Sequence, residues 1–431
     1  MGTNMNNSEK KRQILFRLKI GKNHGNLATG KMPLKKSEPI SQGKVTLIRE
    51  GNVFAPTPLG KKDILILGSK VVAVSKPGEI HISGVSVVEE DASDKLVIPG
   101  FIDSHVHILG GGGEGGPATR APEITIQDII GSGVTTVIGC LGTDGTTRHM
   151  ESLLAKAKGL EIEGVTTYVF SGSYQIPVLT ITGSVRSDIA LIDKIIGAGE
   201  IAISDHRSSQ PTFAEFARLA AECRVGGMLG KKAGVLHCHL GDGSRKLEFL
   251  FRLIAETEIP ITQVIPTHVN RNPGLLDEAL RFILQGGYVD ITAGMDPASD
   301  EDHISIISTI KLCQEKNVPL DHITISSDSN GSMPVFDNLG RLVGLTIATQ
   351  KSLWTNFRHL LEKEALGLEE ILHLFSTTPA VFYKLRQKGE IKPGKDADLL
   401  LLDRDFNLTD SFAMGQKMMA GGKLLVKGTF S

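Results

Sequence analysis

Residues 96–107 read LVIPGFIDSHVH, an apolar and β-branched run that ends in polar residues. Such a run predicts a buried strand, and side-chain alternation along a strand points His105 and His107 to the same side. Two imidazoles on one side can hold one cation, although a single His-X-His pair also arises by chance. The stretch therefore predicts a buried strand with a candidate metal site at its end.

Seven further strand-like segments follow, and helix-like segments separate them. They are VTTVIGCL (134–141), TTYVF (166–170), EIAISD (200–205), AGVLHCH (233–239), ITQVIPTH (261–268), YVDITA (288–293) and HITISSD (322–328). Strands that alternate with helices predict an α/β fold with a parallel sheet, and eight of them predict a (β/α)8 barrel of the TIM type. Side chains at the carboxyl ends of these strands are the candidates for chemistry, because the loops there meet on one face.

Three of the later segments also end in residue types that bind metals, namely His239, His268 and Asp328. In EIAISD, alternation places Glu200 on one face and Asp205 on the other. Glu200 would then lie near the histidines and bridge two cations, whereas the plainer interpretation is a strand-edge glutamate in water. Nitrogen and carboxylate ligands without thiolates suit Zn²⁺, with Mn²⁺, Co²⁺ or Fe²⁺ as substitutes. We therefore expect two divalent cations, with zinc as the first choice.

The two ends of the chain differ from this barrel-like section, residues 96–385. Residues 1–43 are rich in Lys, Asn, Gly and Ser, and we expect a poorly ordered leader rather than a transit peptide. Residues 44–95 and 386–431 contain short β-rich runs with turns marked by Gly and Pro. We expect these two parts to build one small β-sandwich domain beside the barrel.

Composition argues against several classes of partner. Lys and Arg total 47 against 48 Asp and Glu, which gives no electrostatic case for a nucleic-acid or anionic-membrane partner. The four cysteines form no Cys-X-X-Cys pair, which argues against a disulfide framework or a thiolate zinc site. No apolar run approaches the roughly 20 residues of a membrane helix, and no signal-peptide pattern is present. We therefore expect a soluble, cytoplasmic protein that acts on a small molecule.

The order His-X-His, carboxylate, His, His, Asp resembles the amidohydrolase superfamily. Finer motifs resemble one of its families, the isoaspartyl (β-aspartyl) dipeptidases. These motifs are GFIDSHVHILGGGGEGG (100–116), LGTDGTTRH (141–149), ITGSV (181–185), AISDHRS (202–208), PTHVNRN (266–272) and SSDSNGS (326–332). The resemblance implies hydrolysis of β-aspartyl dipeptides by a metal-bridged hydroxide, in a homo-oligomer such as an octamer.

The resemblance also implies roles for individual residues at the metal site. The implied ligands are His105 and His107 for the more buried metal and His239 and His268 for the second. Asp328 is a further ligand, and Glu200 occupies the bridging position. Asp328 is also the implied general base and acid, and Tyr174 the group that polarises the scissile carbonyl. Better-known members of the family carry a carbamylated lysine where this chain has Glu200. A glutamate needs no modification but reaches less far, so we expect the backbone or the metals to move closer.

A second implied set contacts the substrate. Its members are Glu114 for the α-ammonium, Arg207 and Arg271 for carboxylates, and Gly112, Thr143 and Ser332 as further contacts. Planar guanidinium groups bind carboxylates through paired, charge-assisted hydrogen bonds, although surface arginines are the commoner case.

Two alternatives to this function remain open. One is another cyclic-amide amidohydrolase of the dihydroorotase or hydantoinase kind, because the same ligands serve many substrates. The other is a non-catalytic scaffold that keeps the fold.

Overall fold

The computed structural model describes residues 45–294, 296–298, 303–336 and 342–429. The leader predicted for residues 1–43 lies outside the described residues. In the part of the chain that is described, no helix has the length and apolar character needed to cross a membrane.

The central unit is a barrel of parallel strands, and it confirms the predicted fold class. Its strands are β6 (Phe101–Val106), β7 (Val134–Gly139), β8 (Thr166–Ser171), β9 (Ile195–Ile203), β10 (Val235–Leu240), β11 (Val264–Thr267), β12 (Val289–Thr292) and β13 (Ile323–Ser326). Strands β6 to β11 pair in order, and β12 pairs with β13. A parallel bridge between Val106 and Ser329 brings the last strand back to the first. Buried apolar runs form these strands because helices cover their outer sides.

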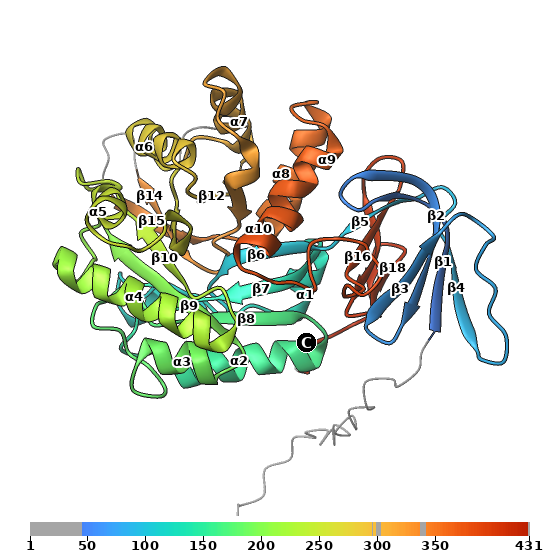
Figure 1. The fold of residues 1–431 in the computed structure, drawn as a ribbon, viewed down its shortest axis with the longest axis horizontal. Coiled ribbons are helices and arrows are strands. Elements are labelled where there is room, and N and C mark those ends of the chain that lie inside the picture. Colours follow the sequence, from blue (N-terminus) through green and yellow to red (C-terminus); the bar gives the residue numbers. More distant parts are fainter. Residues whose placement is uncertain (1–44, 295, 299–302, 337–341, 430–431) are drawn as a thin grey trace, which may run out of the picture. The chain divides into compact units, whose positions relative to one another are not determined.

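Helices follow the strands and cover the outside of the barrel (Figure 1). They are α1 (Ile126–Gly131), α2 (Met150–Glu163), α3 (Val185–Leu191), α4 (Phe213–Gly230), α5 (Glu248–Glu256), α6 (Pro273–Leu284), α7 (Ile306–Glu315), α8 (Lys351–Glu362), α9 (Leu368–Leu372) and α10 (Thr378–Phe382). Side chains cap several of their amino ends. Thr125 and Asp128 form a capping box at α1, and Thr212 and Glu215 form another at α4.

A nine-stranded sheet contains residues from both ends of the described chain. Its strands are β1 (Val45–Phe54), β2 (Pro58–Leu67), β3 (Lys70–Ser75), β4 (Val87–Asp91), β5 (Leu96–Pro99), β16 (Leu399–Leu402), β17 (Leu408–Ala413), β18 (Gln416–Ala420) and β19 (Lys423–Leu424). Strand β5 pairs with β16 antiparallel, so the sheet joins the early and late segments directly. The two parts expected to form a β-rich unit therefore share one continuous sheet.

Lys388 links this sheet to the barrel. Its Nζ lies 2.6 Å from Asp398 Oδ2 and 2.9 Å from Asp396 Oδ2, and it donates to Thr166 Oγ1 on β8 at 2.6 Å. All three charged side chains are buried, at 2–7% exposure. Because a buried charge is costly without a partner, each group depends on the others.

The carboxyl ends of three barrel strands turn sharply. Ser204, His268 and Asp328 follow β9, β11 and β13 with φ of 54°, 60° and 53°. A left-handed backbone costs a residue with a side chain on the order of 1–3 kcal/mol, and such strain gathers where function demands a geometry. After Asp328 the chain forms a hairpin, β14 (Ser332–Phe336) and β15 (Leu342–Ile347).

Candidate active site

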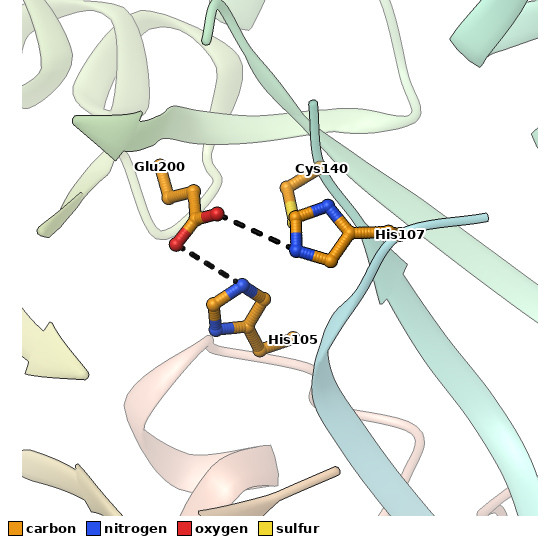
Figure 2. Close-up of side chains that lie close together, drawn as sticks. All are labelled: His105, His107, Cys140 and Glu200. Atoms are coloured by element: carbon orange, nitrogen blue, oxygen red, sulfur yellow. Dashed lines mark hydrogen bonds and ion pairs between the residues drawn. The ribbon is translucent and has the colours of Figure 1, made fainter. Parts of the chain in front are cut away.

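Glu200 lies among four histidines at the carboxyl end of the barrel, and Figure 2 shows its contacts with two of them, His105 and His107. Its Oε1 faces His107 Nε2 at 3.5 Å. Its Oε2 faces His105 Nε2 at 3.2 Å, His239 Nδ1 at 3.1 Å and His268 Nε2 at 3.6 Å. Oε1 therefore faces one histidine and Oε2 faces the other three.

Asp328 completes the cluster from the last barrel strand. Its Oδ1 lies 3.0 Å from His107 Nε2 and 3.6 Å from His105 Nε2. Gly331 makes room for this carboxylate, because a Cβ at position 331 would lie 2.6 Å from the same oxygen. The structure thus brings together all six residues predicted as metal ligands.

The unpaired polar atoms of this cluster fit a divalent cation. His105 Nε2 and Glu200 Oε1 are buried and form no hydrogen bond within the described residues. Their ligand atoms belong to compact groups of histidine and carboxylate donors, one of which also includes the thiol of Cys140, and these are donors that zinc and its neighbours bind. The contacts of Glu200 with His105 and His107 are ion pairs, and buried polar atoms that form no hydrogen bond are rare in folded proteins, so the cluster fits a cation.

Charge in the cluster depends on what occupies it. Burial would raise the pKa of Glu200, but the charges of His105 and His239 outweigh burial and hold this pKa well below its usual range. Burial would lower the pKa of His105, yet Glu200 raises it well above its usual value. Burial lowers the pKa of His268 to about 3, so this ring is neutral. A cation held by these residues would require His105 without a proton on the nitrogen that binds it.

Cys140 lies behind His107, and the sequence analysis gave it no role. Its Sγ is 3.8 Å from His107 Nδ1, whereas His107 Nε2 faces the carboxylates (Figure 2). The thiol therefore contacts the ring nitrogen that points away from Glu200. A small buried cysteine has the sequence signature of a core residue, so no pattern marked it.

Tyr174 reaches the cluster from the loop after β8. Its hydroxyl lies 2.9 Å from His239 Nδ1, the atom that also faces Glu200. Burial raises the pKa of Tyr174 well above its usual value, so the phenol keeps its proton. The predicted carbonyl-polarising group is thus a buried donor next to the six candidate metal ligands. We call these six residues the metal-type cluster: His105, His107, Glu200, His239, His268 and Asp328.

The predicted substrate contacts Glu114, Thr143, Ser332 and Arg207 meet at one point. Glu114 Oε1 accepts a hydrogen bond from Thr143 Oγ1 at 2.9 Å, and its Oε2 accepts one from Ser332 Oγ at 3.0 Å. Arg207 NH1 lies 3.4 Å from Glu114 Oε1. A carboxylate and a guanidinium, each about a quarter exposed, therefore form a pair among polar side chains.

Arg148 holds the glycine-rich loop that carries Gly112 and Glu114. Its guanidinium donates to the carbonyl oxygens of Gly111 at 2.9 Å and Gly112 at 3.3 Å, and pairs with Asp144 at 3.1 Å. Gly112 itself has φ of 73°, a conformation that favours glycine. The motif LGTDGTTRH thus supplies a positioning arginine that we did not predict, because its partners are backbone atoms of a distant loop.

Arg271 does not join the pocket through any contact in the described residues. Its nearest acid is Asp242, with NH1 and Oδ2 4.0 Å apart, and its buried Nε has no hydrogen-bond partner there. Its predicted role is therefore without a contact in this structure. His237, to which no motif gives a role, stacks on Phe170 with ring centres 4.8 Å apart, and its Nε2 lies 3.4 Å from His105 Nδ1.

Asp205 contradicts the prediction that it faces away from Glu200's side of the strand. Its Oδ2 lies 3.0 Å from His239 Nε2 and 2.8 Å from Arg207 NH2. Strand β9 ends at Ile203, and the positive φ of Ser204 interrupts the alternation on which the prediction rested. Burial would raise the pKa of Asp205, but hydrogen bonds from His239 and Arg207 outweigh burial and lower it, so the carboxylate stays ionised.

Comparison with known proteins agrees with this geometry. The model of the amidohydrolase family matches residues 304–425. A crystal structure of β-aspartyl dipeptidase from Fervidobacterium islandicum AW-1, in complex with β-Asp-Leu, is 45% identical, with a TM-score of 0.85, over 90% of this chain and 99% of that one. A second structure of that enzyme is 43% identical, with a TM-score of 0.82, over 89% and 100% of the two chains.

A more distant relative represents the alternative function. The dihydroorotase of Ligilactobacillus salivarius is 25% identical over 422 residues, which cover 83% of this chain and 89% of that protein. Its identity is far below that of the dipeptidase over a similar length. The chain therefore belongs to the β-aspartyl dipeptidase family of the amidohydrolases.

Proposed function

We propose that this chain is a metal-dependent dipeptidase that hydrolyses the isopeptide bond of β-aspartyl dipeptides. The observation that carries the proposal is the pair of Glu114 and Arg207, 3.4 Å apart, with Arg207 NH2 3.2 Å from His239 Nε2. A β-aspartyl residue carries an α-ammonium and an α-carboxylate on one carbon atom, so each group can meet one member of the pair. The aspartyl residue of an α-aspartyl peptide has no free α-carboxylate beside its α-ammonium, because its α-carbonyl forms the peptide bond.

We also propose that the histidine cluster holds two zinc ions. Their ligands would be His105, His107 and Asp328 for one ion, His239 and His268 for the other, and Glu200 for both. The ions would supply a Lewis acid for the scissile carbonyl and make water acidic enough to ionise near neutral pH. Support comes from the buried atoms His105 Nε2 and Glu200 Oε1, which have no hydrogen-bond partner within the described residues.

The chain's own side chains perform the remaining steps. Asp328 Oδ1 takes the proton of the attacking water and later delivers it to the leaving amine. The Tyr174 hydroxyl donates a hydrogen bond to the carbonyl oxygen as negative charge develops there. Glu114 and Arg207 hold the aspartyl end, which orients the scissile bond before reaction.

The test compares turnover of β-Asp-Leu, α-Asp-Leu, dihydroorotate and hydantoin by the zinc-loaded protein. We expect kcat/KM for β-Asp-Leu to exceed that for the other three by at least about a hundredfold, because they leave a charged pocket group unpaired. Preference for dihydroorotate or hydantoin would favour the cyclic-amide alternative. Turnover of none of the four, together with no bound zinc, would favour a scaffold.

A further inference from the structure

One carboxylate contacts both the metal-type cluster and the substrate pocket. Asp205 Oδ1 accepts hydrogen bonds from the backbone nitrogen of Arg207 at 2.7 Å and from its Nε at 3.1 Å. Asp205 Oδ2 accepts from Arg207 NH2 at 2.8 Å and lies 3.0 Å from His239 Nε2. The side chain of Asp205 is only 4% exposed, so water does not compete for these contacts.

The histidine partner is held in one orientation. His239 Nδ1 faces Glu200 Oε2 at 3.1 Å, and His239 Nε2 faces Asp205. A histidine that binds a cation through one nitrogen carries its proton on the other, and that proton needs an acceptor. If His239 binds a cation through Nδ1, Asp205 Oδ2 is the acceptor for the proton on Nε2. Arg207 NH2, 3.2 Å from the same Nε2, then donates to Asp205 Oδ2 rather than to the ring.

The arginine partner is held in the same way. Two parallel hydrogen bonds from Nε and NH2 fix the plane of the Arg207 guanidinium against Asp205. The remaining terminal nitrogen, NH1, lies 3.4 Å from Glu114. Asp205 therefore sets where Arg207 presents its free edge to the pocket.

The backbone around Asp205 is shaped to bring its carboxylate close. Gly241, the residue after β10, lies against it, and a Cβ at position 241 would be 2.5 Å from Asp205 Oδ2. Gln210 Nε2 donates to the Asp205 carbonyl oxygen at 2.9 Å and holds the loop after β9. The carboxylate thus occupies a space that only glycine at position 241 leaves free.

We propose that Asp205 is a positioning residue that couples cation binding at His239 to recognition of the substrate α-carboxylate by Arg207. The inference rests on the proposed function. A cation on Nδ1 requires the proton on Nε2, and that proton holds Asp205 in the orientation that orients Arg207. Loss of this one carboxylate therefore weakens two functions that involve different atoms.

The test uses Asp205→Asn, which keeps the shape but loses the charge and one acceptor oxygen. Zinc titration of the metal-free variant should show one of two sites weakened by about tenfold to a hundredfold, with the other unchanged. At saturating zinc, KM for β-Asp-Leu should rise about tenfold while kcat changes less, because a guanidinium that binds substrate has lost its orientation.

Asp63→Asn is the matched control. Asp63 is a fully buried carboxylate on β2 that accepts from Arg49 NH1 at 3.0 Å and from two backbone nitrogens, so it has the same kind of partners outside the barrel. This control should lower thermal stability without changing zinc affinity or KM. If Asp205→Asn loses stability like the control but keeps both zinc affinity and KM, Asp205 is structural and the proposal is wrong.

Gly241→Ala gives a second route if Asp205→Asn does not fold. Its Cβ would lie 2.5 Å from Oδ2, 2.6 Å from Cβ and 2.7 Å from Cα of Asp205, so it would displace this residue as a whole without removing a charge. We expect the same two defects, each smaller. Gly131→Ala, where a Cβ would meet nothing within 4 Å, is its control. A Gly241→Ala protein with normal zinc affinity and KM would also overturn the proposal. Wild-type protein that binds zinc but does not cleave β-Asp-Leu would refute the proposed function instead, and the zinc titrations would still test the contact with His239.

Discussion

Oε2 of Glu200 lies 3.1 Å from Nδ1 of His239, whereas its other oxygen faces a histidine of a different strand. We predict that Glu200→Ala lowers bound zinc from two ions to at most one and reduces turnover of β-Asp-Leu by at least about a hundredfold, because the remaining ligands no longer share an anion. Elemental analysis of the purified, zinc-loaded variant measures the stoichiometry. Unchanged zinc content with full activity would contradict the bridging role.

Glu200 also predicts independence from carbon dioxide. A carbamylated lysine forms from carbon dioxide, but a glutamate side chain is a carboxylate already. We expect metal-free protein to recover the same zinc content and activity in degassed buffer as in buffer with bicarbonate. Stimulation by bicarbonate would show that another group carries the bridge.

Glu114→Gln should separate binding from chemistry. The variant keeps its shape but loses the charge that meets the substrate α-ammonium, a hydrogen bond worth about 1.5–3 kcal/mol, so KM should rise by about tenfold or more with a smaller change in kcat. Thr143→Val and Ser332→Ala remove only neutral hydrogen bonds to Glu114 and should have smaller effects. A Glu114→Gln variant that loses kcat at constant KM would place Glu114 in the chemical step.

Gly331→Ala tests the position of Asp328. A Cβ at position 331 would lie 2.6 Å from Asp328 Oδ1 and 2.9 Å from its carbonyl oxygen, so the general base must shift. A shift of about 1 Å in a reacting group costs on the order of a hundredfold in rate, which steady-state kcat would report. Gly131→Ala has open space around its Cβ and should match the wild type.

Lys388→Met should destabilise the junction between the sheet and the barrel. The change leaves Asp398 buried without its cation, whereas Asp396 keeps Lys70, whose Nζ lies 2.6 Å from its Oδ1. Removing one partner of a buried ion pair costs about 3–5 kcal/mol of unfolding free energy at pH 7. Lys417→Met is the control, because Lys417 is 18% exposed and its loss should cost less. Urea unfolding measures both variants, and equal losses would contradict the importance of burial.

The effect of Lys388 should depend on pH. Burial would lower the pKa of Lys388, but Asp398 and Asp396 outweigh burial and raise it. Because the folded pKa exceeds the unfolded value of about 10.4, this stabilisation is complete below that pH and is lost as pH rises through the folded pKa. The difference between wild type and Lys388→Met should therefore stay constant from pH 7 to 9 and shrink above pH 10.4. A difference that stays constant above pH 10.4 would contradict this assignment.

The barrel and the clustering of the candidate metal ligands were predictable because both depend on local signals. Parallel strands buried on both sides are apolar runs, and their carboxyl ends bring polar residues such as His239, His268 and Asp328 to one face. Strand β9 was harder to delimit. It begins at Ile195, five residues before the predicted EIAISD segment. The prediction missed this start because Gly197 and Gly199 interrupt the apolar run that marks a strand.

Contacts that depend on distant backbone were not predictable. Asp205 turns toward His239 only because Ser204 leaves the strand with a positive φ, and a period-two pattern carries no signal of that turn. Arg148 donates to backbone carbonyl oxygens of the loop at 109–112. Every residue type has the same carbonyl group, so no sequence pattern marks these acceptors. Asp205 and Arg207 are two residues apart, and this spacing was the one local feature that indicated a contact between them.

The ion pair of Glu114 and Arg207 carries one negative and one positive charge, as does the aspartyl end of the proposed substrate. Entry of a zwitterion exchanges one ion pair for two, and every charge keeps a counterpart. A molecule with only an amine, or only a carboxylate, separates Glu114 from Arg207 but pairs with one of them. The other charged side chain then stays partly buried without a partner, which lowers the affinity. The pocket can therefore reject singly charged competitors without any steric barrier.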